Sequence, residues 1–402
     1  MFSFVMFIKR LMGLLSHNKK KTFEQHDNES PSFYRYSVED ISIFNKLDKD
    51  IDVDICVIGG GLTGVSSALN LAKKGYKVVL IEARKIGSGA SGRNGGQLGI
   101  GMRKDQFFLE NKLGKNHAKE LWNLGIEAVQ EVKKYIQEYN INCALKKGVI
   151  TAGCYPDDSK YFIESIEYMK NNYNFYDYEY LDSKKIKEEI NSKNYYSGIL
   201  NNGSYHLNPL KFLFALVKEL LKLNVKVYEN TEAKEILETE NGVKILTKNN
   251  TIKSNYVVTC CNGYIDNLLG KVKNKFMPIN NYIIATEPLG KSKARELIKN
   301  NYAVCDTRFI IDYYRLSEDS RLLFGGGETF TANFLNNPSK IVYKRMLKVF
   351  PNLRNYKIDF YWGGTLAITI NRLPNFGTLN NGKILFAQGY SGHGLSLSIL
   401  AG

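Results

Sequence analysis

The chain has 402 residues, of which 44% are hydrophobic and 24% are charged. These fractions are typical of globular proteins and exclude a largely disordered chain. Because single domains usually hold roughly 100–200 residues, the length predicts two domains. The 55 Lys and Arg residues exceed the 40 Asp and Glu residues, which gives a net charge of +15. The basic residues are scattered along the chain, so we attribute the surplus to composition and expect no nucleic-acid partner.

The N-terminal stretch from Met1 to Leu15 is apolar but contains Lys9 and Arg10. It is shorter than the roughly 20 apolar residues that a membrane span requires. Its charges do not precede the apolar run, as they do in a signal peptide. We interpret residues 1–50 as an N-terminal arm whose first part is either an unstructured extension or a segment in weak contact with a membrane surface.

The six cysteines have neither C-x-x-C pairing nor the spacing of metal ligands. Thiols without a disulfide framework are typical of a reducing compartment, so we expect a cytoplasmic protein.

A strand, a glycine-rich turn, a helix and a second strand succeed one another within about 30 residues, as in a βαβ unit. They cover residues 54–58, 59–64, 63–74 and 76–81. The glycines let the backbone approach a pyrophosphate at the helix N-terminus, and an acid after the second strand can accept hydrogen bonds from a ribose. We therefore predict an adenine dinucleotide site made of Gly59, Gly61, Leu62, Thr63, Gly64, Glu82, Ala83 and Arg84.

A second glycine-rich loop, residues 87–97, follows directly. Its backbone N–H groups, hydroxyls and guanidinium suit a second phosphate or a flavin ring, although a flexible surface loop has a similar composition. We assign to the cofactor Ser91, Gly92, Arg93, Asn94, Gly95, Gly96 and Gln97.

Helices and hairpin strands then interrupt the nucleotide-binding pattern, which returns near the end of the chain. Helical spacing covers residues 113–139, 158–171, 183–191 and 209–223, the last with Asn208 as its cap and Pro209 at its first position. Strand-like runs cover residues 148–152, 225–228, 242–248, 255–261, 279–287, 309–316 and 322–325. This order predicts two domains that are interleaved in sequence.

Residues 54–61 (DICVIGGG) and 89–97 (GASGRNGGQ) resemble the D-amino-acid oxidase superfamily of FAD-dependent oxidoreductases, and within it the gamma-glutamylputrescine oxidoreductases. The resemblance continues through residues 285–290 (ATEPLG), 312–317 (DYYRLS), 321–326 (RLLFGG) and 389–394 (GYSGHG). It implies an α/β fold with a Rossmann-like FAD-binding domain and an interleaved α+β substrate domain. The FAD domain would comprise residues 51–104, 203–266 and 370–402, and the substrate domain residues 105–202 and 267–369.

The resemblance also implies further cofactor contacts. Ala233 would face the adenine, Cys261 and Asn262 would pass near the pyrophosphate, and the turn of Gly392, His393, Gly394 and Leu395 would lie under the flavin. From chemistry alone, the N–H groups of this turn could stabilise negative charge on the reduced ring.

The chain departs from some relatives in ways that bear on the flavin. Relatives that bind flavin covalently use a Cys or a His where this chain has residues 363–365 and Arg93–Asn94, so we predict non-covalent FAD. Sarcosine-oxidising relatives carry a lysine at the position of Ser396, which argues against that activity and against rapid reaction with oxygen.

Three residues are candidates for contact with the substrate. Arg315 matches an arginine that grips the substrate carboxylate in glycine-oxidising relatives, a role suited to a guanidinium; an exposed hairpin charge is the alternative. Tyr314 precedes it. His393 fits a structural hydrogen bond as well as it fits a chemical role.

We therefore predict an FAD-dependent amine or amino acid oxidoreductase whose partner is a small-molecule amine of gamma-glutamylputrescine or amino-acid type. Hydride would pass from the α-carbon to flavin N5, and the imine would hydrolyse to aldehyde and ammonia. Two alternatives remain. The charge of +15 is compatible with a flavin-dependent tRNA-modifying enzyme. Because the sequence stops soon after the flavin-contacting turn, an inactive or truncated flavin-binding protein is the other.

Overall fold

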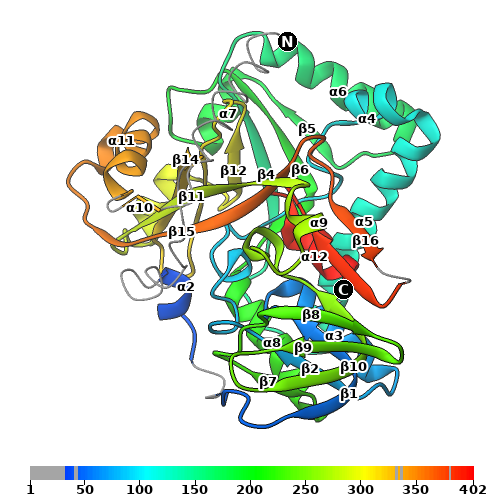
Figure 1. The fold of residues 1–402 in the computed structure, drawn as a ribbon. Coiled ribbons are helices and arrows are strands. Elements are labelled where there is room, and N and C mark those ends of the chain that lie inside the picture. Colours follow the sequence, from blue (N-terminus) through cyan, green and yellow to red (C-terminus); the bar gives the residue numbers. More distant parts are fainter. Residues whose placement is uncertain (1–31, 40–43, 331–333, 336–337, 380–381) are drawn as a thin grey trace.

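The computed structural model of the protein describes residues 32–39, 44–330, 334–335, 338–379 and 382–402. Its strands form two sheets, drawn one below the other in Figure 1, and helices pack against both. The stretch from Met1 to Leu15, for which we considered a membrane-surface contact, lies outside these ranges. None of the helices in them combines the length and the apolarity that a bilayer span requires.

The first sheet has a parallel centre. Strands β17 (Ile384–Gln388), β10 (Thr251–Thr259), β1 (Ile51–Ile58), β2 (Val78–Ile81) and β7 (Lys226–Tyr228) lie side by side in that order. β16 (Asn375–Leu379) pairs antiparallel with β17, and the hairpin of β8 (Glu235–Thr239) and β9 (Gly242–Leu246) pairs with β10. All four residues of β2 are buried, as expected for an apolar run covered on both faces.

Helices α3 (Leu62–Lys73) and α8 (Pro209–Lys222) pack against this sheet, and both begin as predicted. The Asn208 side chain caps α8 by accepting hydrogen bonds from the N–H groups of Leu210 and Lys211, and Pro209 occupies the first helical position. Helix α3 starts directly after the glycine turn, where a Cβ on Gly64 would lie 1.9 Å from the carbonyl oxygen of Gly59. Glycine is therefore required for the helix to begin this close to β1.

The second sheet is mixed. Its order is β15 (Ile358–Thr369), β11 (Phe276–Thr286), β14 (Leu322–Thr329), β13 (Tyr313–Leu316), β12 (Ala303–Asp306), β4 (Lys146–Gly153), β6 (Ser197–His206) and β3 (Gln97–Leu98), and β5 (Tyr178–Leu181) pairs with β6. In Figure 1, helices α4 (Gln106–Leu113), α5 (Lys115–Glu138) and α6 (Asp158–Tyr173) lie at one side of this sheet, and α10 (Lys291–Leu297) and α11 (Ser339–Val349) at the other. The predicted α/β fold with interleaved segments is confirmed.

Two details differ from the sequence-based expectation. The expected boundary between residues 202 and 203 falls inside β6, whose whole length pairs within the second sheet. The strand expected over residues 309–316 begins only at Tyr313, because Asp312 closes a loop before it. The N–H of Asp312 donates to Asp306 Oδ1 at 3.0 Å, and Arg345 Nε donates to Asp312 Oδ1 at 2.5 Å. Local side-chain bonds thus override the extended pattern.

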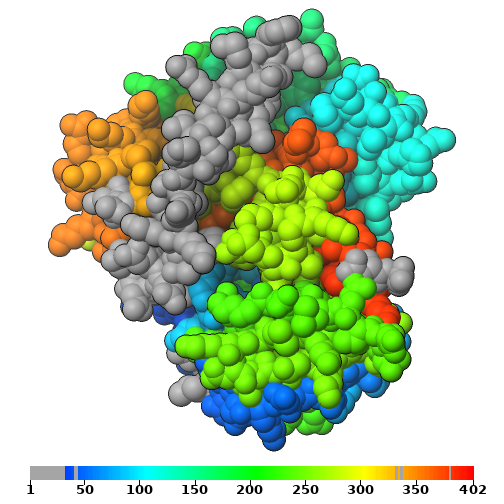
Figure 2. Space-filling model, in the orientation of Figure 1, coloured from blue at the N-terminus to red at the C-terminus, as the bar shows by residue number. Residues whose placement is uncertain are grey.

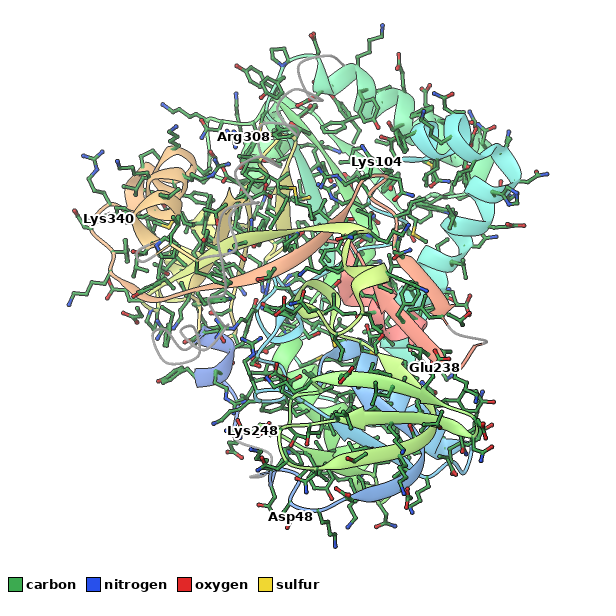
Figure 3. All side chains as sticks on the ribbon, in the orientation of Figure 1. Asp48, Lys104, Glu238, Lys248, Arg308 and Lys340 are labelled. Atoms are coloured by element: carbon green, nitrogen blue, oxygen red, sulfur yellow. The ribbon has the colours of Figure 1, made fainter. Side chains whose placement is uncertain are left out.

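Charged side chains extend from both parts of the molecule in Figure 3. Asp48 and Lys248 lie beside the first sheet, whereas Arg308 and Lys340 lie beside the second. Basic side chains therefore lie beside both sheets.

Truncation of a buried strand residue tests this description of the core. Leu80 on β2 is 0% exposed, so Leu80→Ala should lower the free energy of unfolding by about 2–5 kcal/mol, the range for a leucine removed from a packed interior. Leu237 on β8 is 39% exposed, and Leu237→Ala should change it by about 0.5 kcal/mol or less. Urea unfolding of the purified variants measures both, and equal losses would contradict the assignment of β2 to the core.

Candidate active site

A cavity of about 970 Å³ lies between the two sheets and is lined by residues of both. In Figure 2 the surface is furrowed between the green face of the β8–β9 hairpin and the yellow-green segments above it. The carboxyl ends of β1, β2 and β10 meet the cavity, which is where open parallel sheets bind ligands. Its volume is at the upper end of the range for ligand pockets, about 300–1,000 Å³. An elongated, dinucleotide-sized ligand is the natural occupant.

One end of the cavity is formed around Glu82, which follows β2. Glu82 Oε2 accepts a hydrogen bond from the N–H of Gly60 at 2.7 Å, and Oε1 accepts one from the N–H of Arg84 at 2.9 Å. Burial raises the pKa of Glu82, and the two backbone N–H groups oppose that rise. Each carboxyl oxygen keeps a further lone pair, so Glu82 is able to accept the ribose hydroxyls predicted for it. Ala83, Arg84 and Ala233 line the cavity beside it.

The middle of the cavity is formed by the N-terminus of α3. Its N-cap, Gly61, provides no side-chain cap, so the orphan N–H groups of the first turn are available to an anionic ligand. The N–H of Leu62 is the exception, because it donates to Ser91 Oγ at 2.9 Å and thereby ties the second glycine loop to the helix. A Cβ on Gly61 would lie only 2.7 Å from that oxygen. Backbone donors and close packing at this point suit a pyrophosphate.

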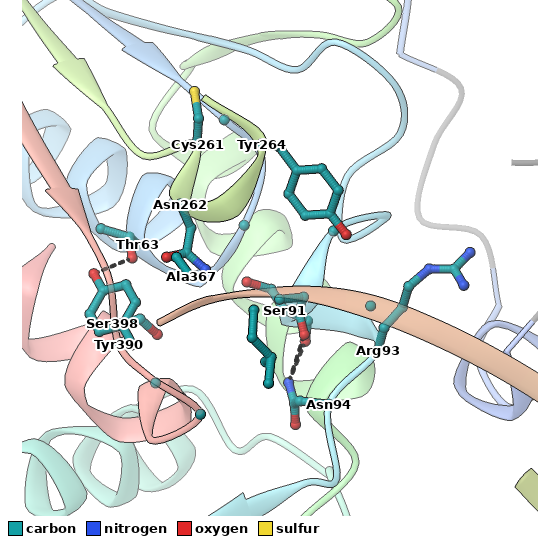
Figure 4. Close-up of a pocket in the computed structure, with 18 of the residues that line it drawn as sticks. Thr63, Ser91, Arg93, Asn94, Cys261, Asn262, Tyr264, Ala367, Tyr390 and Ser398 are labelled. Atoms are coloured by element: carbon teal, nitrogen blue, oxygen red, sulfur yellow. Dashed lines mark hydrogen bonds between the residues drawn. The ribbon is translucent and has the colours of Figure 1, made fainter. Parts of the chain in front are cut away.

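The C-terminal turn is tied to the same helix. Figure 4 shows the 2.7 Å hydrogen bond between the hydroxyls of Thr63 and Tyr390, both of which are buried. The N–H of Gly389 donates to Asn262 Oδ1 at 2.9 Å, which joins the end of β10 to this turn. Beyond the turn, α12 (Gly394–Ala401) begins with Gly394 and Leu395 in the cavity wall. The positive, N-terminal end of the α12 dipole is therefore directed at the ligand atoms that the turn contacts.

Most of the predicted cofactor residues line this cavity. They are Gly59, Gly61, Leu62, Thr63, Glu82, Ala83, Arg84, Ser91, Arg93, Asn94, Gly95, Gln97, Ala233, Cys261, Asn262, Gly392, Gly394 and Leu395. In Figure 4, Ser91, Arg93 and Asn94 lie on the second glycine loop, and Asn94 Nδ2 donates to the carbonyl oxygen of Ser91 at 3.0 Å. The first and second glycine loops and the distant C-terminal turn are thus brought to one site.

Three predicted glycines lie outside the wall and have packing roles instead. A Cβ on Gly64, Gly92 or Gly96 would lie 1.9, 2.2 or 2.3 Å from a backbone carbonyl oxygen. The backbone is too close at these positions for any side chain, and that closeness shapes the loops that do face the cavity.

His393 is likewise outside the cavity wall, and its surroundings favour the structural role over the chemical one. Its ring lies against Gly99, where a Cβ would be 2.7 Å from Cε1. Its buried Nε2 has no hydrogen-bond partner in the described part of the chain. Burial, and to a smaller extent the charge of Arg103, lower the pKa of His393 to about 4. A neutral imidazole that packs between the C-terminal turn and Gly99 fits this environment.

Tyr314 does not face the cavity either. Its ring stacks on Phe324 with 5.3 Å between centroids, and its hydroxyl donates to that of Tyr195 at 3.1 Å. It is part of the core of the second sheet. Its neighbour Tyr313 lines the cavity instead, because successive side chains on a strand point to opposite faces.

Arg315, which we predicted to grip a substrate carboxylate, lies in the protein interior in this structure. Arg315 is 4% exposed and absent from the cavity wall. Its Nε donates to the carbonyl oxygen of Gly95 at 3.0 Å, one Nη donates to that of Leu316, and the other donates to the hydroxyl of Tyr34 at 3.2 Å. Its guanidinium is thus occupied inside the protein, where it fixes the second glycine loop.

Sequence reasoning missed several residues of the cavity wall that lie in the second sheet or in loops beside it. Tyr313 lies over Gly95, where a Cβ would be 2.8 Å from Cδ2, and its hydroxyl donates to Asn281 Oδ1 at 2.5 Å. The others include Phe309, Ile311, Glu328, Phe330, Arg103, Lys104 and Arg372. If the start of β13 had been known, the alternation of side chains along the strand would have identified Tyr313. Nothing in the sequence pattern indicates Arg372, which is located in the turn after β15.

Replacement of Arg315 tests its assignment as a residue that positions the loop. Arg315→Lys removes the fork that holds Gly95 and Tyr34, so FAD should bind about tenfold more weakly or worse, a loss of about 1.4 kcal/mol. The KM of an amine substrate measured at saturating FAD should change little. Arg295→Lys, at an exposed position of α10, is the matched control. A raised KM with unchanged FAD affinity would restore the substrate-binding role.

Residues 54–402 match the family model DAO, FAD dependent oxidoreductase. The chain is 36% identical over 363 residues to "Probable oxidoreductase OrdL" of Haemophilus influenzae, covering 89% of this chain and 83% of that protein. It is 35% identical over 375 residues to "Gamma-glutamylputrescine oxidoreductase" of Escherichia coli, covering 92% and 87%.

Solved structures agree in fold. The L-proline dehydrogenase of P. horikoshii superposes with a TM-score of 0.70 at 24% identity, covering 89% of this chain and 91% of that one. The glycine oxidase of Geobacillus kaustophilus superposes with a TM-score of 0.72 at 18% identity, covering 87% and 92%. The cavity fits the cofactor that the family name implies: it has uncapped helix N-termini, an acid at the ribose position and glycines where side chains would collide. The predictions of the family and of FAD are confirmed, and the chain belongs to the DAO family of FAD-dependent oxidoreductases.

Proposed function

We propose that this protein oxidises a primary amine of the gamma-glutamylputrescine type with FAD as the electron acceptor. The observation that carries the proposal is the continuity of the cavity, which extends from the dinucleotide cradle to a compartment lined by Tyr313, Asn281 and Glu328 of the second sheet. The relative of that name, matched over most of both chains, supports the choice of substrate. The six free thiols of the chain support a reducing, cytoplasmic location.

FAD, when bound, supplies a two-electron acceptor for hydride. The α-carbon of the neutral amine gives up a hydride, which leaves an imine. Water then adds to the imine, and aldehyde and ammonia are released. The task of the protein is to orient the amine and to exclude water while hydride moves. Tyr313 is suited to orientation because its hydroxyl is held by Asn281, whose own Nδ2 donates to the carbonyl oxygen of Gly327 at 3.1 Å. Phe309, Ile311 and Phe330 supply apolar contact for methylene groups.

We further propose that FAD is held without a covalent bond. Cys260 and Cys261 line the cavity, and burial raises the pKa of both thiols, which keeps them protonated and unreactive. Acid precipitation of the yellow protein should therefore release all of the FAD into the supernatant. Flavin fluorescence that stays with the polypeptide on a denaturing gel would contradict this.

An anaerobic bleaching assay tests the reaction itself. Mixing with gamma-glutamylputrescine should bleach the flavin absorbance near 450 nm, and the rate should rise with pH as the amine loses its proton, because only the neutral amine donates hydride. The pKa of such an amine is about 10, as for lysine. A rate that falls as pH rises would contradict the requirement for a neutral amine.

The control is gamma-glutamylbutylamide, which has no terminal amine and should leave the flavin oxidised. Failure of every amine to bleach it would favour a flavin-binding protein without amine oxidation. Turnover of free amines that is insensitive to ionic strength would argue against a tRNA substrate.

A further inference from the structure

Three charged side chains from distant segments line the cavity on its second-sheet side. Arg103 precedes α4, Glu328 is the penultimate residue of β14, and Arg372 occupies the turn between β15 and β16. Lys104 lies in the same wall. We refer to Arg103, Glu328 and Arg372 as the charged triad. Its members were not among the residues that the sequence pattern singled out.

The charges of the triad are not neutralised by ion pairs with other residues that the structure describes. In the described part of the chain, none of the three has a partner within 4.0 Å, whereas Arg308, Arg321 and Arg345 are all paired with aspartates. A charged group that lines a cavity without a partner is a candidate for ligand binding.

The three groups are nevertheless close enough to influence one another. Burial raises the pKa of Glu328, and Arg372 and Arg103 oppose the rise. Burial lowers the pKa of Arg372, and the charge of Arg103 lowers it further. Burial thus disfavours the charged forms of both Glu328 and Arg372. A ligand with an ammonium group for Glu328 and a carboxylate for the arginines would stabilise these charges.

The balance of charge favours one class of ligand. Two guanidiniums and one carboxylate leave a positive surplus, to which Lys104 adds. A free diamine, which carries two positive charges, is repelled by this surplus. An α-amino acid group presents a carboxylate and an ammonium on one carbon, which matches a guanidinium pair beside a carboxylate.

The chemistry of the reaction decides which end of the substrate the triad binds. The amine that is oxidised must be neutral, and a nearby carboxylate would keep it protonated. Glu328 is therefore unsuited to the reacting amine and suited to an ammonium that stays charged throughout. The non-reacting amino-acid end of a conjugated diamine meets that requirement.

On the basis of the proposed function, we propose that Arg103 and Arg372 bind the α-carboxylate and Glu328 the α-ammonium of the substrate's amino-acid end, so that the distal amine is directed to the flavin. The triad thereby selects amines conjugated to an amino acid over free diamines.

Two substrates with the same reacting end test this assignment. Gamma-glutamylputrescine and N-acetylputrescine share the aminobutyl amide, but only the first carries the amino-acid end. In the FAD-loaded protein, the ratio of their kcat/KM values should fall roughly tenfold or more in Arg372→Gln and in Arg103→Gln, mainly through the KM of gamma-glutamylputrescine. Arg372→Lys should retain part of the ratio, and the exposed Arg295→Gln on α10 should keep all of it.

Binding without turnover provides the second measurement. Gamma-glutamylbutylamide lacks the oxidisable amine, so its dissociation constant, from calorimetry or from perturbation of the flavin spectrum, reports on the amino-acid end alone. It should bind the unaltered protein and bind Arg372→Gln and Glu328→Gln roughly tenfold more weakly.

The outcomes separate this inference from the proposed function. If no amine bleaches the flavin but gamma-glutamylbutylamide binds in a triad-dependent manner, the proposed reaction fails and the recognition site stands. If amines bleach the flavin while the triad variants leave both the kcat/KM ratio and this binding unchanged, the recognition site is overturned and the reaction stands.

Discussion

The structure depends on one buried cation without a counter-charge. In the described part of the chain Arg315 has no carboxylate within ion-pair distance, and its guanidinium is satisfied by two carbonyl oxygens and the hydroxyl of Tyr34. Because such a charge is costly to bury unless its hydrogen bonds are complete, the three segments that supply them are held together. One of these carbonyls belongs to Gly95, in the loop that faces the cavity. The cofactor loop is therefore set by the second sheet and not only by the nucleotide-binding fold.

This arrangement gives the N-terminal arm a role. Tyr34 lies in α2 (Phe33–Tyr36) and packs edge-on against Trp362, whose Nε1 donates to the carbonyl oxygen of Arg93 at 3.1 Å. The arm, the glycine loop and β15 thus form one connected contact region. Held on several sides, the loop is preorganised for its ligand, and less ordering entropy is lost when the ligand binds.

Sequence reasoning succeeded where backbone geometry leaves few choices. The βαβ unit, the acid after β2 and the cap of α8 are local, because each depends on neighbours within a few residues. Sequence reasoning was less successful where long-range packing determines which side chains face the cavity. Tyr314 and Arg315 were placed in the site by resemblance, but the loop closed by Asp312 sets the start of β13 and so turns Tyr313 to the cavity. Charged residues in turns, such as Arg372, carry no periodic signal.

The contrast between Arg315 and Arg372 shows what an arginine's environment reveals about its role. Both belong to segments near the cavity, and both are plausible carboxylate ligands by residue type. All three nitrogens of the Arg315 guanidinium donate to protein oxygens, and the side chain is buried outside the cavity wall. Arg372 faces the cavity and has no ion-pair partner among the described residues, so a ligand would satisfy it without disrupting the fold. We therefore infer that the cation that shapes the site and the cations that we propose to bind the substrate are separate residues in this member of the family.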